Sequence, residues 1–147
     1  MKLKISSPSK IIYEWDIKQI SLPTESGTIT ILPNHTPLVT ALKPGIVKIM
    51  PENAPSGEFI FSENAISLSV SKGMAFVDGK VVRIVTAVAT TSPEESADTL
   101  QKMKEETEAQ IKLLKQKGSI EDIEKSLIKL EKINADIKLE QIKKVSK

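Results

Sequence analysis

The chain has 147 residues, a net charge of +2 and 27% charged residues, a composition typical of an ordinary folded protein with one medium domain or one small domain plus an appendage. It contains no cysteine and one histidine, which excludes disulfides, zinc–thiolate centres, a cysteine nucleophile and multi-histidine metal sites. The net charge is too small to indicate nucleic acid by itself, and no apolar run approaches the roughly 20 residues that span a bilayer. The first residues carry no signal-peptide pattern, so we expect the chain to fold where it is made.

Residues 1–90 show the alternation of apolar and polar residues that is typical of β-strands. The apolar positions change parity near Lys18, which predicts a bulge or a break in a long strand. Asp78-Gly79 predicts a hairpin with a type I′ turn. Proline and glycine punctuate the region about every ten residues, so we expect an antiparallel sandwich or barrel.

Residues 92–147 predict two helices. Ser92 and Pro93 suit the N-cap and first position of one helix, with glutamate at the third position. Gly118 suits a left-handed C′ position that ends this helix, and Ser119 with Asp122 suits a capping pair that starts the next. Each helix has one thin apolar stripe: Ala97, Leu100, Met103, Ile111 and Leu114 with Thr107 in the gap, then Ile120, Ile123, Leu127, Leu130, Ile133 or Asn134, and Ile137.

The fold class expected from these patterns is α+β, an N-terminal antiparallel β-sandwich or barrel over 1–90 followed by an antiparallel two-helix hairpin over 91–147. A hairpin with thin stripes buries little area and is marginal alone. It can dock on its own sandwich, dock on a partner, or alternate between the two.

Residues with catalytic potential are few. His35 lies in a proline-bounded loop, where it is either a contact residue or a turn residue bonded to its own loop, and no G-x-S-x-G elbow accompanies it. The paired carboxylates fall on water-facing helix positions, no phosphate-binding glycine loop exists, and the lysines lack interleaved aromatics. We therefore expect no catalytic, cofactor-binding or metal-binding residues and no nucleic-acid partner, but a non-enzymatic interaction protein.

Two segments resemble the epsilon subunit of F-type (F1Fo) ATP synthase. The run 22–40, which contains Leu-Pro-Asn-His-Thr-Pro, is followed by Leu-Lys-Pro-Gly at 42–45. It is similar to that family's Gly-acid-Leu-Gly-Ile-Leu-Pro-Asn-His-x-Pro loop and Leu-x-Pro-Gly turn. The run 71–77 resembles the family's Gly-Gly-Phe segment, with Lys72 in place of the first glycine. The resemblance covers nearly the whole chain.

The resemblance implies a non-catalytic central-stalk (rotor) subunit of a proton-translocating F-type ATP synthase. Such a subunit couples the c-ring to gamma and modulates ATP hydrolysis through its C-terminal helices, which reach the alpha3beta3 catalytic head. It also implies a peripheral membrane protein at the cytoplasmic face of a bacterial plasma membrane, with an organellar membrane as the other setting. The residues alone leave two alternatives open. The first is a free-standing adaptor that binds a soluble partner through the hairpin, and the second, ranked behind it, is an enzyme with a carboxylate-only site.

The resemblance further implies which residues make contacts. The C-terminal lysines Lys138, Lys143 and Lys144 would pair with an acidic loop on the catalytic beta subunit. Many members start the first helix with a nucleotide-binding motif that ends in Arg-Ala, and this chain has no arginine after Arg83, so we expect no appreciable ATP binding. The c-ring loop would contact a polar residue at Thr28 and an apolar one at Ile31, within the set Thr28, Ile31, Leu32, Asn34 and His35.

Overall fold

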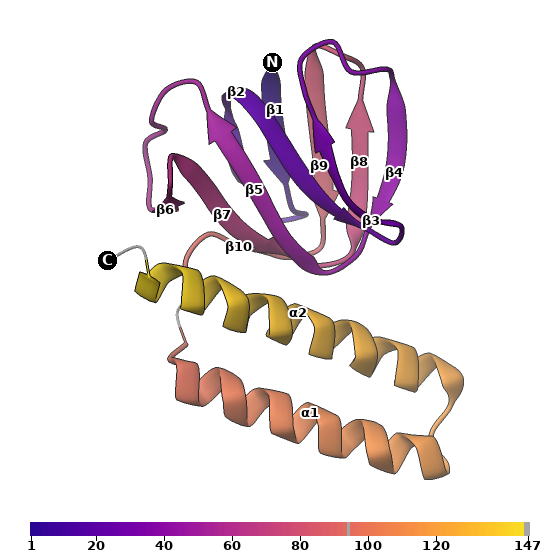
Figure 1. Cartoon of the computed structure of the whole chain (residues 1–147). Coiled ribbons are helices and arrows are strands. Elements are labelled where there is room, and N and C mark those ends of the chain that lie inside the picture. Colours follow the sequence, from indigo (N-terminus) through magenta and orange to yellow (C-terminus); the bar gives the residue numbers. More distant parts are fainter. Residues whose placement is uncertain (94, 146–147) are drawn as a thin grey trace.

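A computed structural model of the chain describes residues 1–93 and 95–145, and it shows a β-sandwich that rests on a hairpin of two long helices (Figure 1). The predicted fold class is confirmed in both parts. The last strand ends at Thr90 and the first helix begins at Ala97.

The ten strands belong to one sheet that folds over into two layers (Figure 1). Along the sheet the order is β1-β9-β8-β4-β2-β5-β7-β10, with β3 paired to β2 and β6 paired to β7. Strand β1 pairs with β2 as well as β9, which closes the layers on each other. The bounds are β1 Lys2–Ser6, β2 Ile11–Thr24, β3 Gly27–Ile31, β4 Leu38–Leu42, β5 Gly45–Pro51, β6 Ile60–Ser62, β7 Ala65–Val70, β8 Gly73–Val77, β9 Val81–Thr86 and β10 Ala89–Thr90.

The long strand β2 serves both layers. Its first half pairs with β1, and its second half pairs with β5 and β3. The register shifts between Ile17 and Gln19, so the bulge predicted near Lys18 is confirmed. A bulge bends and twists a strand, which lets one strand cross from one layer to the other.

The core between the layers is aliphatic and is built from residues of the sheet, from Leu3 to Ile84. Tyr13 lies within it, with its ring edge-on to Trp15 and Phe59 at centroid distances of 4.9 and 5.6 Å. The sandwich thus has a hydrophobic core of its own, separate from its contact with the helices.

Two tight turns of the sandwich, β6–β7 and β8–β9, differ from the expectation. The β8–β9 hairpin exists, but its loop is residues 78–80 and only Gly79 has a positive φ, so the type I′ prediction is wrong. Asp78 instead accepts hydrogen bonds from the amides of Lys80 and Val81, which lower the pKa of its carboxyl. The I′-like turn is Glu63-Asn64 between β6 and β7, where both residues have positive φ.

The structure at 71–77 explains why the chain has one glycine, Gly73, where the family that it resembles has two. Gly73 sits opposite Thr86 in the β8–β9 pair, and a Cβ there would collide with the carbonyl oxygen of Val85. Lys72 is exposed and meets no such limit. Close backbone approach therefore requires glycine at the second position only.

Helix α1 spans Ala97–Lys117 and helix α2 spans Ile120–Val145. The N-cap of α1 is Ser96, whose hydroxyl accepts from the Thr99 amide at 3.2 Å, so the prediction of a start at Ser92 is wrong. Capping of α2 by Ser119 is confirmed by its hydrogen bond from the amide of Asp122.

The loop between the helices uses Gly118 in an unexpected way. Its φ is −94°, so it is extended and not left-handed as predicted. Glycine is needed here because a Cβ would collide with the backbone and side chain of Leu114. Its amide donates to the Leu114 carbonyl and closes the end of α1.

Helix α2 lies between the sandwich and α1 (Figure 1) and packs on β5, β6 and β7. The predicted α1 stripe is confirmed, since Leu100, Thr107 and Ile111 are buried. The predicted α2 stripe is incomplete. Two of its members, Ile120 and Leu127, are exposed, whereas Ala135 and Leu139, which lie outside it, are buried.

Candidate functional site

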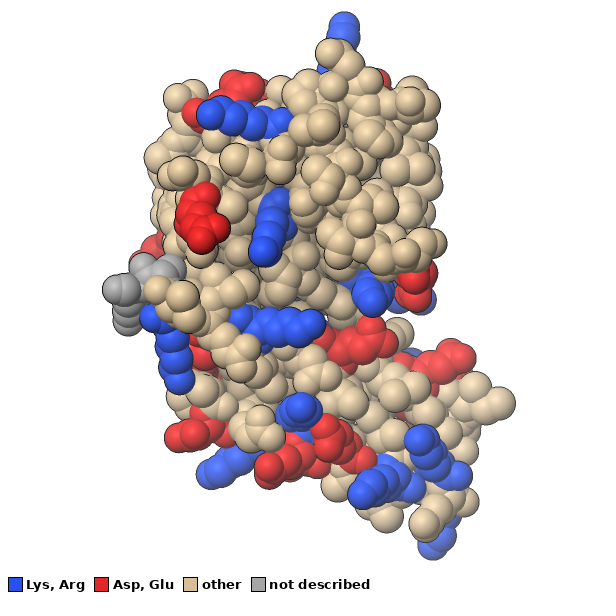
Figure 2. All heavy atoms as spheres, in the orientation of Figure 1, with Lys and Arg blue, Asp and Glu red and all other residues tan. Residues whose placement is uncertain are grey.

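The described part of the chain contains no cluster of histidine and acidic side chains that could hold a metal ion. Among the same residues, neither helix is long and apolar enough to cross a membrane. Charged side chains gather over the helices, whereas the face of the sandwich seen in Figure 2 is mostly uncharged. The candidate sites are therefore the exposed surfaces of the sandwich and the hairpin, together with the contact between α2 and the sandwich, which we call the joint.

Four polar side chains join α2 to the sandwich. The carboxylate of Asp136 accepts hydrogen bonds from Lys132 Nζ at 2.6 Å and from Ser69 Oγ at 2.5 Å. Lys132 Nζ also donates to Thr90 Oγ1 at 3.0 Å. The Lys132 and Asp136 side chains are only 13% and 17% exposed, so water screens this cluster weakly. The sequence pattern did not indicate this cluster.

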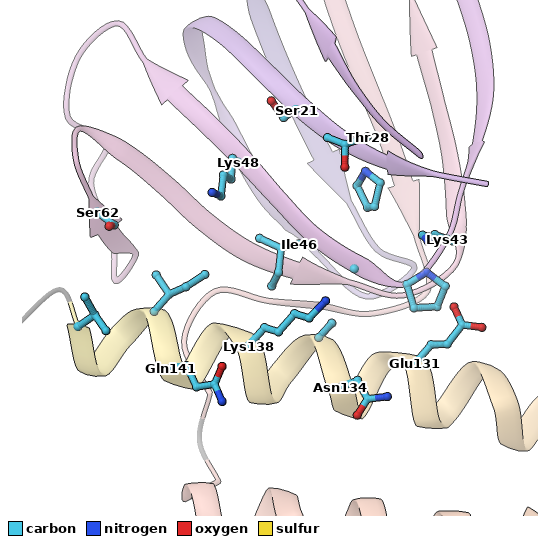
Figure 3. Close-up of a pocket in the computed structure, with 16 residues that line it drawn as sticks. Ser21, Thr28, Lys43, Ile46, Lys48, Ser62, Glu131, Asn134, Lys138 and Gln141 are labelled. Atoms are coloured by element: carbon cyan, nitrogen blue, oxygen red, sulfur yellow. The ribbon is translucent and has the colours of Figure 1, made fainter. Parts of the chain in front are cut away.

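A groove of about 970 Å³ lies beside this joint, between α2 and the outer face of β2, β3 and β5 (Figure 3). Thr28 and Lys48 lie on the sandwich side, and Lys138 points from α2 towards it. Lys43 and Glu131 lie at one end of the groove. The groove thus brings together Thr28 and Lys138, which the sequence assigned to different partners.

A smaller pocket of about 550 Å³ lies on the other side of the joint. It is lined by Lys10 from the sandwich and by Lys125, Lys129 and Lys132 from α2. Lys132 is bound to Asp136, and Lys125 lies 3.5 Å from Glu121. The pocket is basic, but two of its cations already face carboxylates.

The five residues predicted for the ring contact are spread along β3 and the loop that follows. Thr28 stands at the beginning of β3 and Leu32 follows its end, a separation on the order of 13 Å along a strand. Ile31 is fully buried in the core, so it cannot make the predicted apolar surface contact. Leu32, which is 52% exposed, is the apolar side chain available there.

The loop 32–37 is fixed against the β8–β9 turn. The amide of Asn34, which has a positive φ, donates to the Gly79 carbonyl at 2.9 Å. His35 Nδ1 lies 2.7 Å from the Thr36 carbonyl oxygen, which can only accept, so the ring nitrogen donates. His35 is thus hydrogen-bonded within its own loop, which is one of the two roles that the sequence left open for it.

The three predicted regulatory lysines lie near the end of α2. Lys138 and Lys144 are exposed and Lys143 is half-buried. They share a helix with Lys132 and Asp136, so their position follows that of the joint.

A surface that the sequence analysis missed lies on the outer face of β4, β8 and β9. We call it the outer patch, and its members are Val39, Ala41, Met74, Phe76 and Val85. Val39 is paired with Phe76, and Met74 is paired with both Ala41 and Val85. All five are exposed, with Val39 at 61%. The signal was present in the sequence, because these apolar residues stand at the outward parity of their strands.

Comparisons with known proteins agree with this architecture. A family model described as ATP synthase, Delta/Epsilon chain, beta-sandwich domain, matches residues 1–92. The chloroplastic ATP synthase epsilon chain of Psilotum nudum is 31% identical over 131 residues, which is 86% of each chain. The ATP synthase epsilon chain of Nitratiruptor is 30% identical over 81 residues, 55% of this chain and 63% of the relative. A chain in the mitochondrial ATP synthase structure of Euglena gracilis, with OSCP, F1 and c-ring, aligns with a TM-score of 0.68 at 23% identity over 90% of this chain and 76% of that one, a likeness of fold.

Proposed function

The chain belongs to the ATP synthase delta/epsilon chain family, and on that basis we propose that it is a non-catalytic rotor subunit of the central stalk. In this role it joins gamma to the c-ring and restrains ATP hydrolysis through its hairpin. The proposal is supported by the family, by a sandwich with an exposed apolar face, and by a hairpin whose contact with the sandwich includes a polar cluster. Membership of the family disfavours the free-standing adaptor.

The observation that carries the stalk role is the outer patch. Its cross-strand neighbours form one continuous apolar surface, and Arg83, the paired neighbour of Phe76, gives it a basic edge. Contiguous exposed apolar residues mark protein interaction sites. The patch lies on β4, β8 and β9, whereas α2 packs on β5, β6 and β7. A gamma subunit bound there leaves the hairpin free to move.

The ring contact is proposed at two separate points. One is Thr28 at the start of β3, and the other is the loop with Leu32, Asn34 and His35 beside the β8–β9 turn. Cysteine at Thr28 and cysteine at Asn34 should be crosslinked separately to the c-subunit loop. The position that crosslinks identifies the end of the sandwich that faces the ring, and failure at both moves the contact elsewhere.

The regulatory part of the proposal concerns α2. Polar Thr107 and Asn134 interrupt the apolar stripes of the hairpin and weaken its packing. The free energies of the docked and extended states then need to differ by only a few kcal/mol. In the extended state Lys138, Lys143 and Lys144 would face the acidic loop of the catalytic beta subunit in the alpha3beta3 head. Each exposed pair would contribute about 0.2–1 kcal/mol, so several must act together.

The stalk role is tested by assembly. Phe76→Asp places a charge on the outer patch without disturbing the core, and Leu113→Asp is the matched control on exposed α1 surface. We expect the Phe76 variant to be lost when the ATP synthase is purified from membranes and the Leu113 variant to be retained. Equal retention of both variants would move the gamma contact away from the outer patch.

A further inference from the structure

The joint between α2 and the sandwich has a matched spacing. Ser69 on β7 and Thr90 on β10 are direct cross-strand partners. Lys132 and Asp136 are one helical turn apart on α2. Neighbouring strands lie about 4.8 Å apart and side chains at i and i+4 about 5–6 Å apart. The two charges on the helix therefore fit the two hydroxyls on the sheet.

Other positions of the helix lose this fit. A slip of one turn in one direction brings Asp136 and Glu140 over the hydroxyls and takes Lys132 away from them. A slip in the opposite direction brings Ile128 over Thr90 and takes Asp136 away. The buried apolar side chains nearby distinguish these positions less, because burial is not directional.

The Lys132–Asp136 ion pair is largely buried, and this suits the cluster to a switch between a docked and an undocked helix. A weakly exposed ion pair adds little net stability compared with apolar side chains, but breaking it leaves a charge without a partner. Such groups are suited to fixing a register, as polar residues do in coiled coils.

We propose that Ser69, Thr90, Lys132 and Asp136 form a register latch that holds α2 in one docked position and opens as a unit when the hairpin leaves. The regulatory use of the latch rests on the proposed function above, whereas the docking itself does not. Within the latch Asp136 is the central group, since its one oxygen accepts from both strand and helix.

The latch also reaches the connection between the two parts. Strand β10 has two residues, Ala89 and Thr90, and the Thr90 hydroxyl is held by Lys132. Opening the latch removes this support from a strand that is too short to be stable alone. Residues 89 and 90 then lengthen the connection between the sandwich and α1, so the hairpin can move farther from the sandwich when it is released.

The test uses the isolated full chain. It contains no cysteine, so Glu14→Cys on β2 and Ile120→Cys on α2, both exposed, accept spin labels at two chosen places. Distance distributions between the labels then give the ratio of docked to undocked hairpin. We expect Asp136→Asn and Ser69→Ala each to lower this ratio about tenfold or more, and hydrogen exchange at residues 89–90 to rise in parallel.

Controls make the result specific. Glu124→Gln removes an exposed acid from the same helix and should change the ratio less than twofold. Combining Asp136→Asn with Ser69→Ala should cost little more than either alone, because the two groups share one bond. Thr90→Ala, on the short last strand, removes the other hydroxyl and should lower the ratio by less than Ser69→Ala does. Trp15 fluorescence checks that the sandwich is intact.

The latch is overturned if both single variants keep the docked fraction of the Glu124 control, or if their effects multiply as independent changes do. Neither result bears on assembly or on hydrolysis by the complex, which are measured separately. A failed latch and a failed proposed function are thus distinguished.

Discussion

Thr28 on β3 and Lys138 on α2 line the same groove, although the sequence suggested that one contacts the membrane ring and the other the catalytic head (Figure 3). While the hairpin is docked, a partner that reaches Thr28 also meets the α2 surface. If the ring contacts Thr28 as proposed, that contact and the position of the hairpin are linked, because both use one groove.

A labelling experiment measures this link. Thr28→Cys should react about two- to threefold more slowly with a bulky neutral maleimide in the full chain than in residues 1–91, because α2 forms one wall of the groove. Thr36→Cys, exposed in the loop at the end of β3, is the control and should react equally in both. Equal rates at Thr28 in the two chains would contradict the link.

The sandwich is expected to fold without the hairpin. Every member of the core cluster lies between Leu3 and Ile84, and removing the helices exposes mainly the joint surface. Residues 1–91 should therefore show one cooperative thermal transition, followed through the single tryptophan, Trp15. Absence of such a transition would mean that the hairpin is part of the fold and not an appendage.

Several features could be predicted because they depend on local chemistry. The bulge at Lys18, the cap at Ser119 and the α1 stripe follow from side-chain parity, hydrogen bonding and helical period. Ser96 displaced Ser92 as N-cap because both residues offer the same hydroxyl, and local sequence does not choose between them. The Glu63-Asn64 turn was missed because it lacks the glycine usual at such positions.

The joint could not be predicted for a different reason. Lys132 and Asp136 are an ordinary i, i+4 pair in the sequence, and such pairs usually face water. Only the fold shows that Ser69 and Thr90 lie opposite each other and beneath this pair. The partner hydroxyls are 67 and 42 residues away, so their contact is a property of the topology.

Tyr13 offers a test of the core. Within the described residues its buried hydroxyl has no hydrogen-bond partner, and burial raises its pKa to about 12. Tyr13→Phe should therefore leave the free energy of unfolding unchanged or raise it by up to about 1 kcal/mol, measured by denaturant titration. A loss of more than about 1 kcal/mol would reveal a partner for the hydroxyl.

The same residue predicts a pH dependence. The pKa of Tyr13 is higher in the folded chain than in the unfolded chain, so its contribution is complete below pH 10 and is lost as the pH rises towards 12. The stability difference between Tyr13→Phe and the parent chain should grow in favour of phenylalanine over this range. A difference that stays constant from pH 8 to pH 11 would contradict the shift.

The hairpin is not expected to bind ATP appreciably. The basic pocket beside the joint offers lysines as point charges but no guanidinium fork, and Lys125 and Lys132 already face carboxylates. Titration calorimetry of the isolated chain should show no binding in the micromolar range. Micromolar affinity that is lost in Lys129→Ala would show that the pocket is a nucleotide site.

The hydrolysis rate of the assembled ATP synthase tests the central claim, the hairpin as a reversible brake, most directly. The complex is prepared with the full chain and with the chain truncated after Thr91, and hydrolysis is measured without a proton gradient at low and high salt. The account predicts normal assembly and faster hydrolysis by the truncated complex, with charge reversal of Lys143 and Lys144 giving part of the increase. If the truncated complex assembles and hydrolyses ATP no faster than the full complex at either salt concentration, the hairpin is not a brake.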